Sequence, residues 1–115
     1  MLVLCQSLHD PEVLDMKRKV YTLCGSVKFM DKILEIHENL ELEGYVVIGI
    51  VQHIRQKPYT HEEEELLDVI HRIKIDMADA IYVVNVNGYI GSSTQGEIEY
   101  AKKTGKEITY YVNPD

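Results

Sequence analysis

The sequence predicts an α/β fold, a compact three-layer sandwich in which a parallel sheet of four or five strands lies between two layers of helices. Short apolar and β-branched segments, at Val20–Cys24, Tyr45–Ile50 and Ala80–Val86, have the composition of strands buried on both faces. Longer segments between them repeat apolar residues at helical spacing. This alternation, with short connections, is typical of the right-handed crossovers of flavodoxin-like and Rossmann-like folds.

A helix is expected directly after the first central strand. Strand Val20–Cys24 leads into a turn at Gly25 and Ser26, and the helix then spans residues 27–43. Gly44 is placed to end this helix, because glycine readily adopts the positive φ that is common just beyond a helix. The expected buried stripe consists of Phe29, Ile33, Ile36 and Leu40.

The middle of the chain predicts a long loop and a second helix. Residues 51–59 form an irregular segment that is long enough to act as a lid. Thr60 is the expected N-cap of the following helix, and the glutamates at 62–65 fall in its first turn, where they are interpreted as a solvated helix start. The residues expected to face the sheet are Leu66, Ile70, Ile73 and Met77.

The last third of the chain predicts a ligand-binding loop. Strand Ala80–Val86 is followed by a loop rich in glycine and serine, a helix that Gly105 closes, and a final strand at 108–112. Ligands of open α/β sheets bind beside the carboxyl ends of the strands. We therefore expect one pocket between the turn at 25–28, the loop at 51–59 and the loop at 88–97.

Length and charge restrict the class of protein. A chain of 115 residues predicts a single domain, 1–115, with residues 1–18 as an N-terminal appendage. The appendage contains a candidate edge strand, Leu2–Leu4, and a candidate short helix, 11–18, with Asp10 as its cap. The 19 acidic and 12 basic residues give a net charge of −7 without a basic run, so a polymeric nucleic acid is not an expected partner. The sequence contains no signal peptide and no apolar segment of membrane length, which predicts a cytoplasmic protein without a membrane partner.

Neither cysteine predicts a metal site. Cys5 and Cys24 lack metal-binding or redox spacing, and Cys24 does not open a Cys-x5-Arg phosphatase loop, so it is interpreted as a residue at a strand end. His61 precedes four glutamates, but no histidine follows at the fourth position after it, as a His-Glu-x-x-His metal motif would require. We expect no metal and no other cofactor.

Glu97 is the leading candidate for chemistry. It follows the buried strand and the glycine- and serine-rich loop, near the start of a helix whose free N–H groups favour anions. Thr94 and Glu97 also have the Thr-x-x-Glu spacing of a capping box, in which the glutamate stabilises the helix start. Spacing alone leaves both interpretations open.

Three segments carry a resemblance to a known family. They are Gly96–Lys106 (Gly-Glu-Ile-Glu-Tyr-Ala-Lys-Lys-Thr-Gly-Lys), Leu23–Lys28 (Leu-Cys-Gly-Ser-Val-Lys) and Met77–Ile81 (Met-Ala-Asp-Ala-Ile). Their sequences and order resemble the nucleoside 2-deoxyribosyltransferase family and its nucleoside 5′-monophosphate N-glycosidase relatives, over roughly residues 19 to 112. The resemblance implies that Glu97 is a nucleophile and that the chain forms a homodimer or larger assembly in which a neighbouring subunit completes the pocket.

The chemistry of that family suits the residues present. Cleavage of an N-glycosidic bond passes through an oxocarbenium-like state, and a retaining enzyme places an ionised carboxylate beneath the anomeric carbon to form a glycosyl-enzyme intermediate. The helix N-terminus is expected to keep Glu97 ionised. Two groups of residues are candidates for holding a 5′-phosphate, although each also has an interpretation as an ordinary turn or cap: Gly25, Ser26 and Lys28, and Gly91, Ser92 and Ser93.

The sequence also departs from the family. Thr22 stands where a tyrosine is common, Gly91 where some transferases have an acidic residue, and His71 where the family has a substrate-positioning aspartate. His71 has three possible roles: donating a proton to the base, forming a hydrogen bond to the sugar or Glu97, or filling a half-buried helix position without a catalytic part. These departures leave a second hypothesis open, a non-catalytic nucleotide-binding or sensor module on the same fold.

Overall fold

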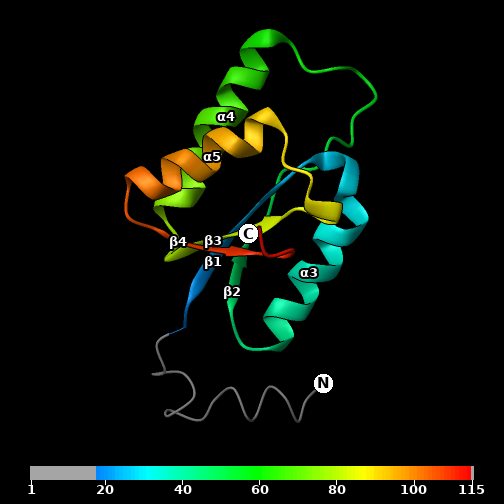
Figure 1. The fold of residues 1–115 in the computed structure, drawn as a ribbon. Helices are drawn as coiled ribbons and strands as arrows, with labels where there is room; N and C mark the ends of the chain where they lie inside the picture. The colour runs from blue at the N-terminus through cyan, green and yellow to red at the C-terminus, as the bar shows by residue number, and fades with distance from the viewer. Residues whose placement is uncertain (1–17, 115) are drawn as a thin grey trace, which may run out of the picture.

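The computed structural model describes residues 18–114, and in these residues four parallel strands form one sheet between two helical layers (Figure 1). The strand order is β2-β1-β3-β4, and the strands are β1 (Val20–Gly25), β2 (Val46–Ile48), β3 (Ala80–Val84) and β4 (Glu107–Tyr110). The expected flavodoxin-like, Rossmann-like α/β sandwich is therefore confirmed, with four strands. The expectations for residues 1–17 lie outside the described residues.

The helices cover both faces of the sheet. Helix α3 (Met30–Leu42) lies on one face, and α4 (His61–Asp76) and α5 (Ser92–Lys103) lie on the other (Figure 1). The chain moves outward from β1 to β2 and then back across β1 to β3, so right-handed crossovers require opposite faces for α3 and α4. Short 3₁₀ turns, η1 (Val27–Phe29) and η2 (Val86–Gly88), follow β1 and β3.

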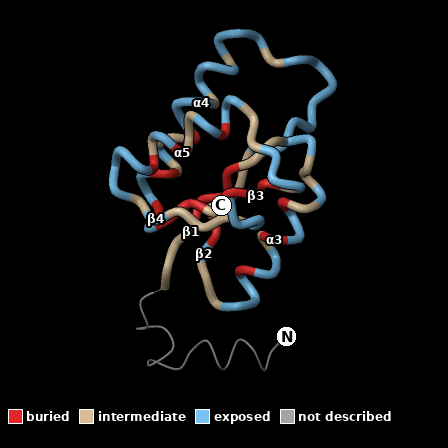
Figure 2. Tube along the Cα trace, viewed as in Figure 1, coloured by how far each residue is buried: buried red, intermediate tan, exposed pale blue. Residues whose placement is uncertain are grey.

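Burial concentrates in the strands and on the inward faces of the helices (Figure 2). Neighbouring residues of β1 point to opposite layers: Leu23 packs in the cluster with Ile33 of α3, and Cys24 in the cluster with Ile75 of α4 and Ile98 of α5. Full burial of one large aliphatic side chain contributes about 1.5–3 kcal/mol. These two cores hold the helices against the sheet and so position the loops that follow the carboxyl ends of its strands.

Most of the expected features of α3 are confirmed. Ile33, Ile36 and Leu40 are buried, and Gly44 follows the helix with φ +100°. The helix starts later than expected, because Ser26 caps a 3₁₀ turn before α3 begins at Met30.

The expected buried face of α4 is wrong. Leu66, Ile70, Ile73 and Met77 are 38–67% exposed, whereas His71 and Ile75 are buried. Both sets repeat at helical spacing, and the histidine within the second set made it the less apolar choice in the sequence. Helix α4 consequently directs a polar ring towards the sheet and leaves an apolar stripe on the surface.

One of two Thr-x-x-Glu patterns forms a capping box. The Thr60 hydroxyl accepts from the Glu63 N–H at 3.1 Å, and the Glu63 carboxylate accepts from the Thr60 N–H at 2.8 Å, as expected for the start of α4. The second pattern, Thr94 and Glu97, does not form a capping box, because α5 begins at Ser92 with Gly91 as N-cap. Glu97 therefore lies in the second turn of α5 and is free of the capping role.

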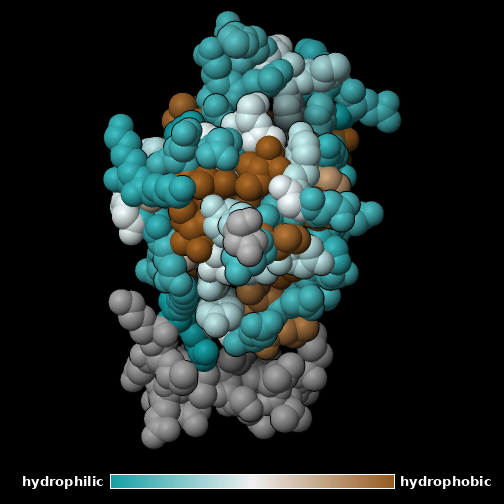
Figure 3. All heavy atoms as spheres, in the orientation of Figure 1, coloured by the Kyte–Doolittle hydropathy of each residue, from teal (hydrophilic) through white to brown (hydrophobic). Residues whose placement is uncertain are grey.

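On the face shown in Figure 3, hydrophilic side chains cover most of the periphery and apolar side chains gather in the middle. Within residues 18–114, no helix has both the length and the apolar composition needed to cross a membrane.

Candidate functional site

A cleft of about 450 Å³ lies at the carboxyl ends of β1 and β3. The chain leaves these neighbouring strands in opposite directions along the sheet, which is the point where open α/β sheets bind ligands. The three expected loop regions all reach the cleft. Seven of the eight candidate residues line it: Gly25, Ser26, His71, Gly91, Ser92, Ser93 and Glu97.

The inner end of the cleft brings together three side chains from three elements. His71 of α4 places Nε2 3.6 Å from Oε1 of Glu97 on α5. The same nitrogen lies 3.5 Å from Sγ of Cys24, which is fully buried in β1 behind the cleft. Cys24 is thus part of the site, and strand position alone did not indicate this.

Burial controls the charges of this group. It raises the pKa of Glu97 to about 7, an effect that a hydrogen bond from Cys24 and the charge of Arg72 only partly oppose. The expectation that the helix N-terminus favours the ionised form of Glu97 is therefore wrong, because Glu97 lies one turn inside the helix and burial favours the neutral form. About half of the Glu97 carboxyl groups are ionised near pH 7.

Burial also acts on His71. It lowers the pKa of the imidazole to about 4, and Lys74 lowers it further, although a hydrogen bond to the Leu23 backbone opposes this shift. His71 is therefore neutral at pH 7, so its contact with Glu97 is not an ion pair at that pH. A neutral ring favours orientation of Glu97 over donation of a proton to a leaving base.

The N-terminus of α5 supplies groups that can bind an anion. Gly91 offers no side-chain cap, so the first N–H groups of this 12-residue helix have neither an intrahelical acceptor nor a capping side chain. Ser92 and Ser93 are exposed on the same turn and line the cleft. Backbone N–H groups, hydroxyls and the positive end of the helix dipole together suit a phosphate or carboxylate.

The turn after β1 requires glycine and adds one more hydroxyl. A Cβ atom on Gly25 would lie 3.0 Å from the Val84 carbonyl oxygen, so the two strands approach too closely for a side chain. Ser26 caps the following turn by accepting from the Lys28 N–H at 3.4 Å. Ser26 therefore acts as an ordinary helix cap, one of the two interpretations that the sequence had left open for this turn.

Lys28 is the one candidate that does not line the cleft. Its ammonium lies 3.6 Å from the centre of the Tyr89 ring, a cation–π contact, and Tyr89 itself lines the cleft. The Lys28 ammonium is therefore held beside the cleft by its contact with the Tyr89 ring.

Sequence reasoning missed several lining residues. Leu67 and Asp68 precede His71 by four and three positions, so helical spacing from His71 was the signal that could have identified them. Asp68 brings a carboxylate into the cleft, and its charge raises the pKa of Glu97. Ile50 and Glu64 were also missed, whereas the remaining lining residues, Val27, Val51, Tyr59, Tyr89 and Thr94, lie within the loop regions that were expected to surround the cleft.

The loop at 51–59 is tied to the start of α4. Arg55 forms a two-point pair with the Glu63 carboxylate, and the His53 and Tyr59 rings stack with centroids 4.0 Å apart. Val51 and Tyr59 contribute to the cleft wall. The loop therefore forms part of the cleft wall, and the pair between Arg55 and Glu63 attaches it to the capping box of α4.

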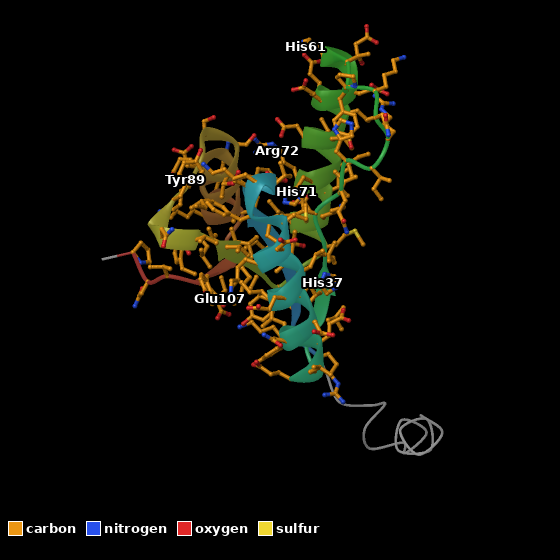
Figure 4. All side chains as sticks on the ribbon, turned by 90° about the vertical axis from the view of Figure 1, so that its right-hand side faces the viewer. His37, His61, His71, Arg72, Tyr89 and Glu107 are labelled. Atoms are coloured by element: carbon orange, nitrogen blue, oxygen red, sulfur yellow. The ribbon has the colours of Figure 1, made fainter. Side chains whose placement is uncertain are left out.

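The histidines of α4 lie in different surroundings (Figure 4). His71 lies towards the middle of the molecule beside Arg72, and His61 lies at the far end of the helix. The separation of ten positions corresponds to about 15 Å along the helix axis. His61 contacts Glu65 at 2.8 Å on the surface, which is consistent with a solvated helix start and not with a part of the site.

Comparisons of the chain with protein-family models, with curated proteins and with solved structures each find no match. The family resemblance therefore remains a prediction from the sequence.

Proposed function

We propose that the protein cleaves or transfers the N-glycosidic bond of a nucleoside or nucleoside 5′-monophosphate, with Glu97 as nucleophile. The observation that carries the proposal is that the Glu97 carboxylate and the uncapped N-terminus of α5 line one cleft. Ser92 and Glu97 are five positions apart, about 7.5 Å along the helix axis. One small molecule can therefore contact both an anion-binding turn and a carboxylate.

The ionised form of Glu97 performs the reaction. Its carboxylate oxygen bonds to the anomeric carbon as the carbon–nitrogen bond breaks, and the departing base takes up a proton from the solvent. The resulting glycosyl ester is then attacked by water or by a second base. His71 contacts the carboxylate and restricts its orientation, so it acts as a positioning residue.

The polar groups at the mouth of the cleft favour a phosphorylated substrate. Ser92, Ser93 and the N–H groups of the α5 turn would hold the 5′-phosphate. Ser26 also lines the cleft, and the Lys28 ammonium contacts the lining residue Tyr89. The proposed chemistry needs no metal, and we place the reaction in the cytoplasm, as predicted from the sequence.

The test compares wild-type protein with Glu97→Gln during incubation with nucleosides and 5′-monophosphates, with and without an acceptor base, followed by chromatography. We expect free or exchanged base from the wild type and none from Glu97→Gln. Glu99→Gln, on the exposed side of the same helix, is the matched control and should retain the wild-type rate. Full turnover by Glu97→Gln would reject the proposal.

A nucleotide-binding module without catalysis is the second candidate. It is favoured by Thr22, which stands in the place of the family's tyrosine and is fully buried, its hydroxyl donating to the Lys74 carbonyl at 2.7 Å. Thr22 does not line the cleft and cannot replace a tyrosine there. Tight binding of a nucleotide that is recovered intact after long incubation would support this function.

We also propose that a second copy of the chain covers the apolar stripe of α4. The stripe consists of Leu66, Val69, Ile70, Ile73 and Met77, each 38–67% exposed. The last turn of α4 holds Asp76 as well as Lys74, whose ammonium donates to the Gly49 carbonyl at 3.0 Å, so the apolar side chains and not paired charges would drive this contact.

A further inference from the structure

We propose that Cys24, His71 and Glu97 form a binding site for a divalent zinc-type ion at the inner end of the cleft. The thiol sulfur, a ring nitrogen and a carboxylate oxygen of these residues all lie within 4.8 Å of one another. They come from β1, α4 and α5, so the fold holds together three donors that are far apart in sequence.

The spacing of the donors suits a tetrahedral ion. Zinc lies about 2.3 Å from sulfur and about 2.0–2.2 Å from nitrogen or oxygen, which places neighbouring ligand atoms of a tetrahedron roughly 3.3–3.6 Å apart. The observed separations are 3.5 Å from Cys24 Sγ to His71 Nε2 and 3.6 Å from that nitrogen to Glu97 Oε1. The sulfur of Cys24 and the carboxylate oxygen of Glu97 lie within 4.8 Å of each other.

The surroundings prepare His71 to act as a ligand. A hydrogen bond to the Leu23 backbone favours the protonated imidazole, and Nε2 faces Cys24 and Glu97, so we infer that Nδ1 carries the proton of this bond. That arrangement leaves the lone pair of Nε2 directed at the other two donors. A second hydrogen bond of this kind is usual for histidines that bind zinc.

The donor set selects the class of ion and leaves one position open. Sulfur, nitrogen and a single carboxylate suit zinc and its neighbours in the transition series, whereas magnesium and calcium prefer oxygen ligands. Three protein ligands leave the fourth position of a tetrahedron for water. That position faces the cleft, because His71 and Glu97 line the cleft and Cys24 lies behind them.

Binding of the metal ion would change the protonation of Cys24 and the availability of Glu97. The sulfur–hydrogen bond of Cys24 breaks, its proton passes to solvent, and a sulfur–metal bond forms without any change of oxidation state. Because the ion occupies the Glu97 carboxylate, it should inhibit glycosidic cleavage. Only this inhibition rests on the proposed function, and the binding itself does not.

Titration with Co²⁺, a spectroscopic substitute for zinc, tests the site in the full-length protein. Cys5→Ser is used as the background so that any thiolate signal reports Cys24. We expect one ion per chain, a thiolate-to-cobalt charge-transfer band in the near ultraviolet and displacement by zinc. Cys24→Ala and His71→Ala should lose the band and weaken binding at least about 10-fold. Ser93→Ala, which changes the cleft but no ligand, should bind as the background does.

Circular dichroism checks that each variant is folded, and Cys24→Ser and Glu97→Gln provide smaller changes if either alanine variant is not. Absence of the band in the background protein, or an unchanged band in folded Cys24→Ala or Cys24→Ser, would overturn the site. Base release is measured separately in a chelator. Cleavage without metal binding would leave the proposed function and reject the site, and binding without cleavage would do the reverse.

Discussion

His71 Nε2 lies 3.6 Å from Glu97 Oε1 in the gap between α4 and α5, and the two side chains are only 11% and 14% exposed. Burial shifts the two groups in opposite directions: it raises the pKa of Glu97 to about 7 and lowers that of His71 to about 4. Desolvation disfavours the charged form of both. Near neutral pH, therefore, the histidine is neutral and the carboxyl group is divided between its two states.

The first prediction is a rise of cleavage rate with pH. The nucleophile must be ionised, so kcat/KM should increase about tenfold per pH unit at acidic pH and level off above about 7, the pKa of Glu97. The measurement is base release between about pH 5 and pH 9 in the presence of a chelator, with the fold checked at each pH. A rate that falls as the pH rises through this range would show that Glu97 acts as an acid.

The second prediction concerns stability. The pKa of Glu97 is raised on folding, so its protonated form favours the native state: this contribution is fully present below about 4.5 and is lost as the pH rises through about 7. Glu97→Gln does not titrate. Relative to the wild type, it should gain up to about 3 kcal/mol of unfolding free energy between these limits.

Urea unfolding of metal-free protein at about pH 5 and pH 8 measures this difference. His71 has the opposite dependence, because its lowered pKa gives a contribution that is present above 6.5 and lost as the pH falls through about 4. It remains in both proteins and cancels to first order in the comparison. An equal pH dependence of the wild type and Glu97→Gln would show that the pKa of Glu97 is unchanged on folding.

The two Thr-x-x-Glu patterns show what short spacing can and cannot predict. Thr60 and Glu63 form the expected box, but the same spacing at Thr94 and Glu97 lies inside a helix that starts earlier, at Ser92. The loop before α5 determines that start, and a four-residue pattern contains no information about it. Resemblance over a longer segment directed attention to Glu97 as a cleft residue.

The third prediction tests the cap that does form. Thr60→Ala removes the acceptor for the Glu63 N–H and should cost about 1 kcal/mol of unfolding free energy. Amide hydrogen exchange in the first turn of α4 should accelerate at the same time. Ser92→Ala, on the exposed first turn of α5, is the control and should change stability by less than about 0.5 kcal/mol. Equal losses in the two variants would contradict a specific capping role for Thr60.

The layer order, the strands and the loops of the cleft could be predicted because apolar composition and glycine positions reflect local requirements. The rotation of α4 could not. Its two candidate faces have similar spacing, and the buried one contains His71, whose cost of burial is offset by Cys24, Glu97 and the Leu23 backbone. Such compensation depends on two other elements of the chain, β1 and α5, and is not encoded in the periodicity of α4.

The exposed face of α4 leads to the fourth prediction, which concerns assembly. Ile70 lies at the centre of the apolar stripe, 38% exposed, with Leu66 and Ile73 one turn away on either side. If two copies pack through this stripe, Ile70→Glu places a charge in the apolar contact on both sides of a twofold axis and should convert a dimer to a monomer. Light scattering coupled to size exclusion measures the mass. Leu42→Glu changes an equally apolar residue on α3 that is 80% exposed, and it should leave the mass unchanged. A wild-type monomer, or a dimer that survives Ile70→Glu, would remove α4 as the interface.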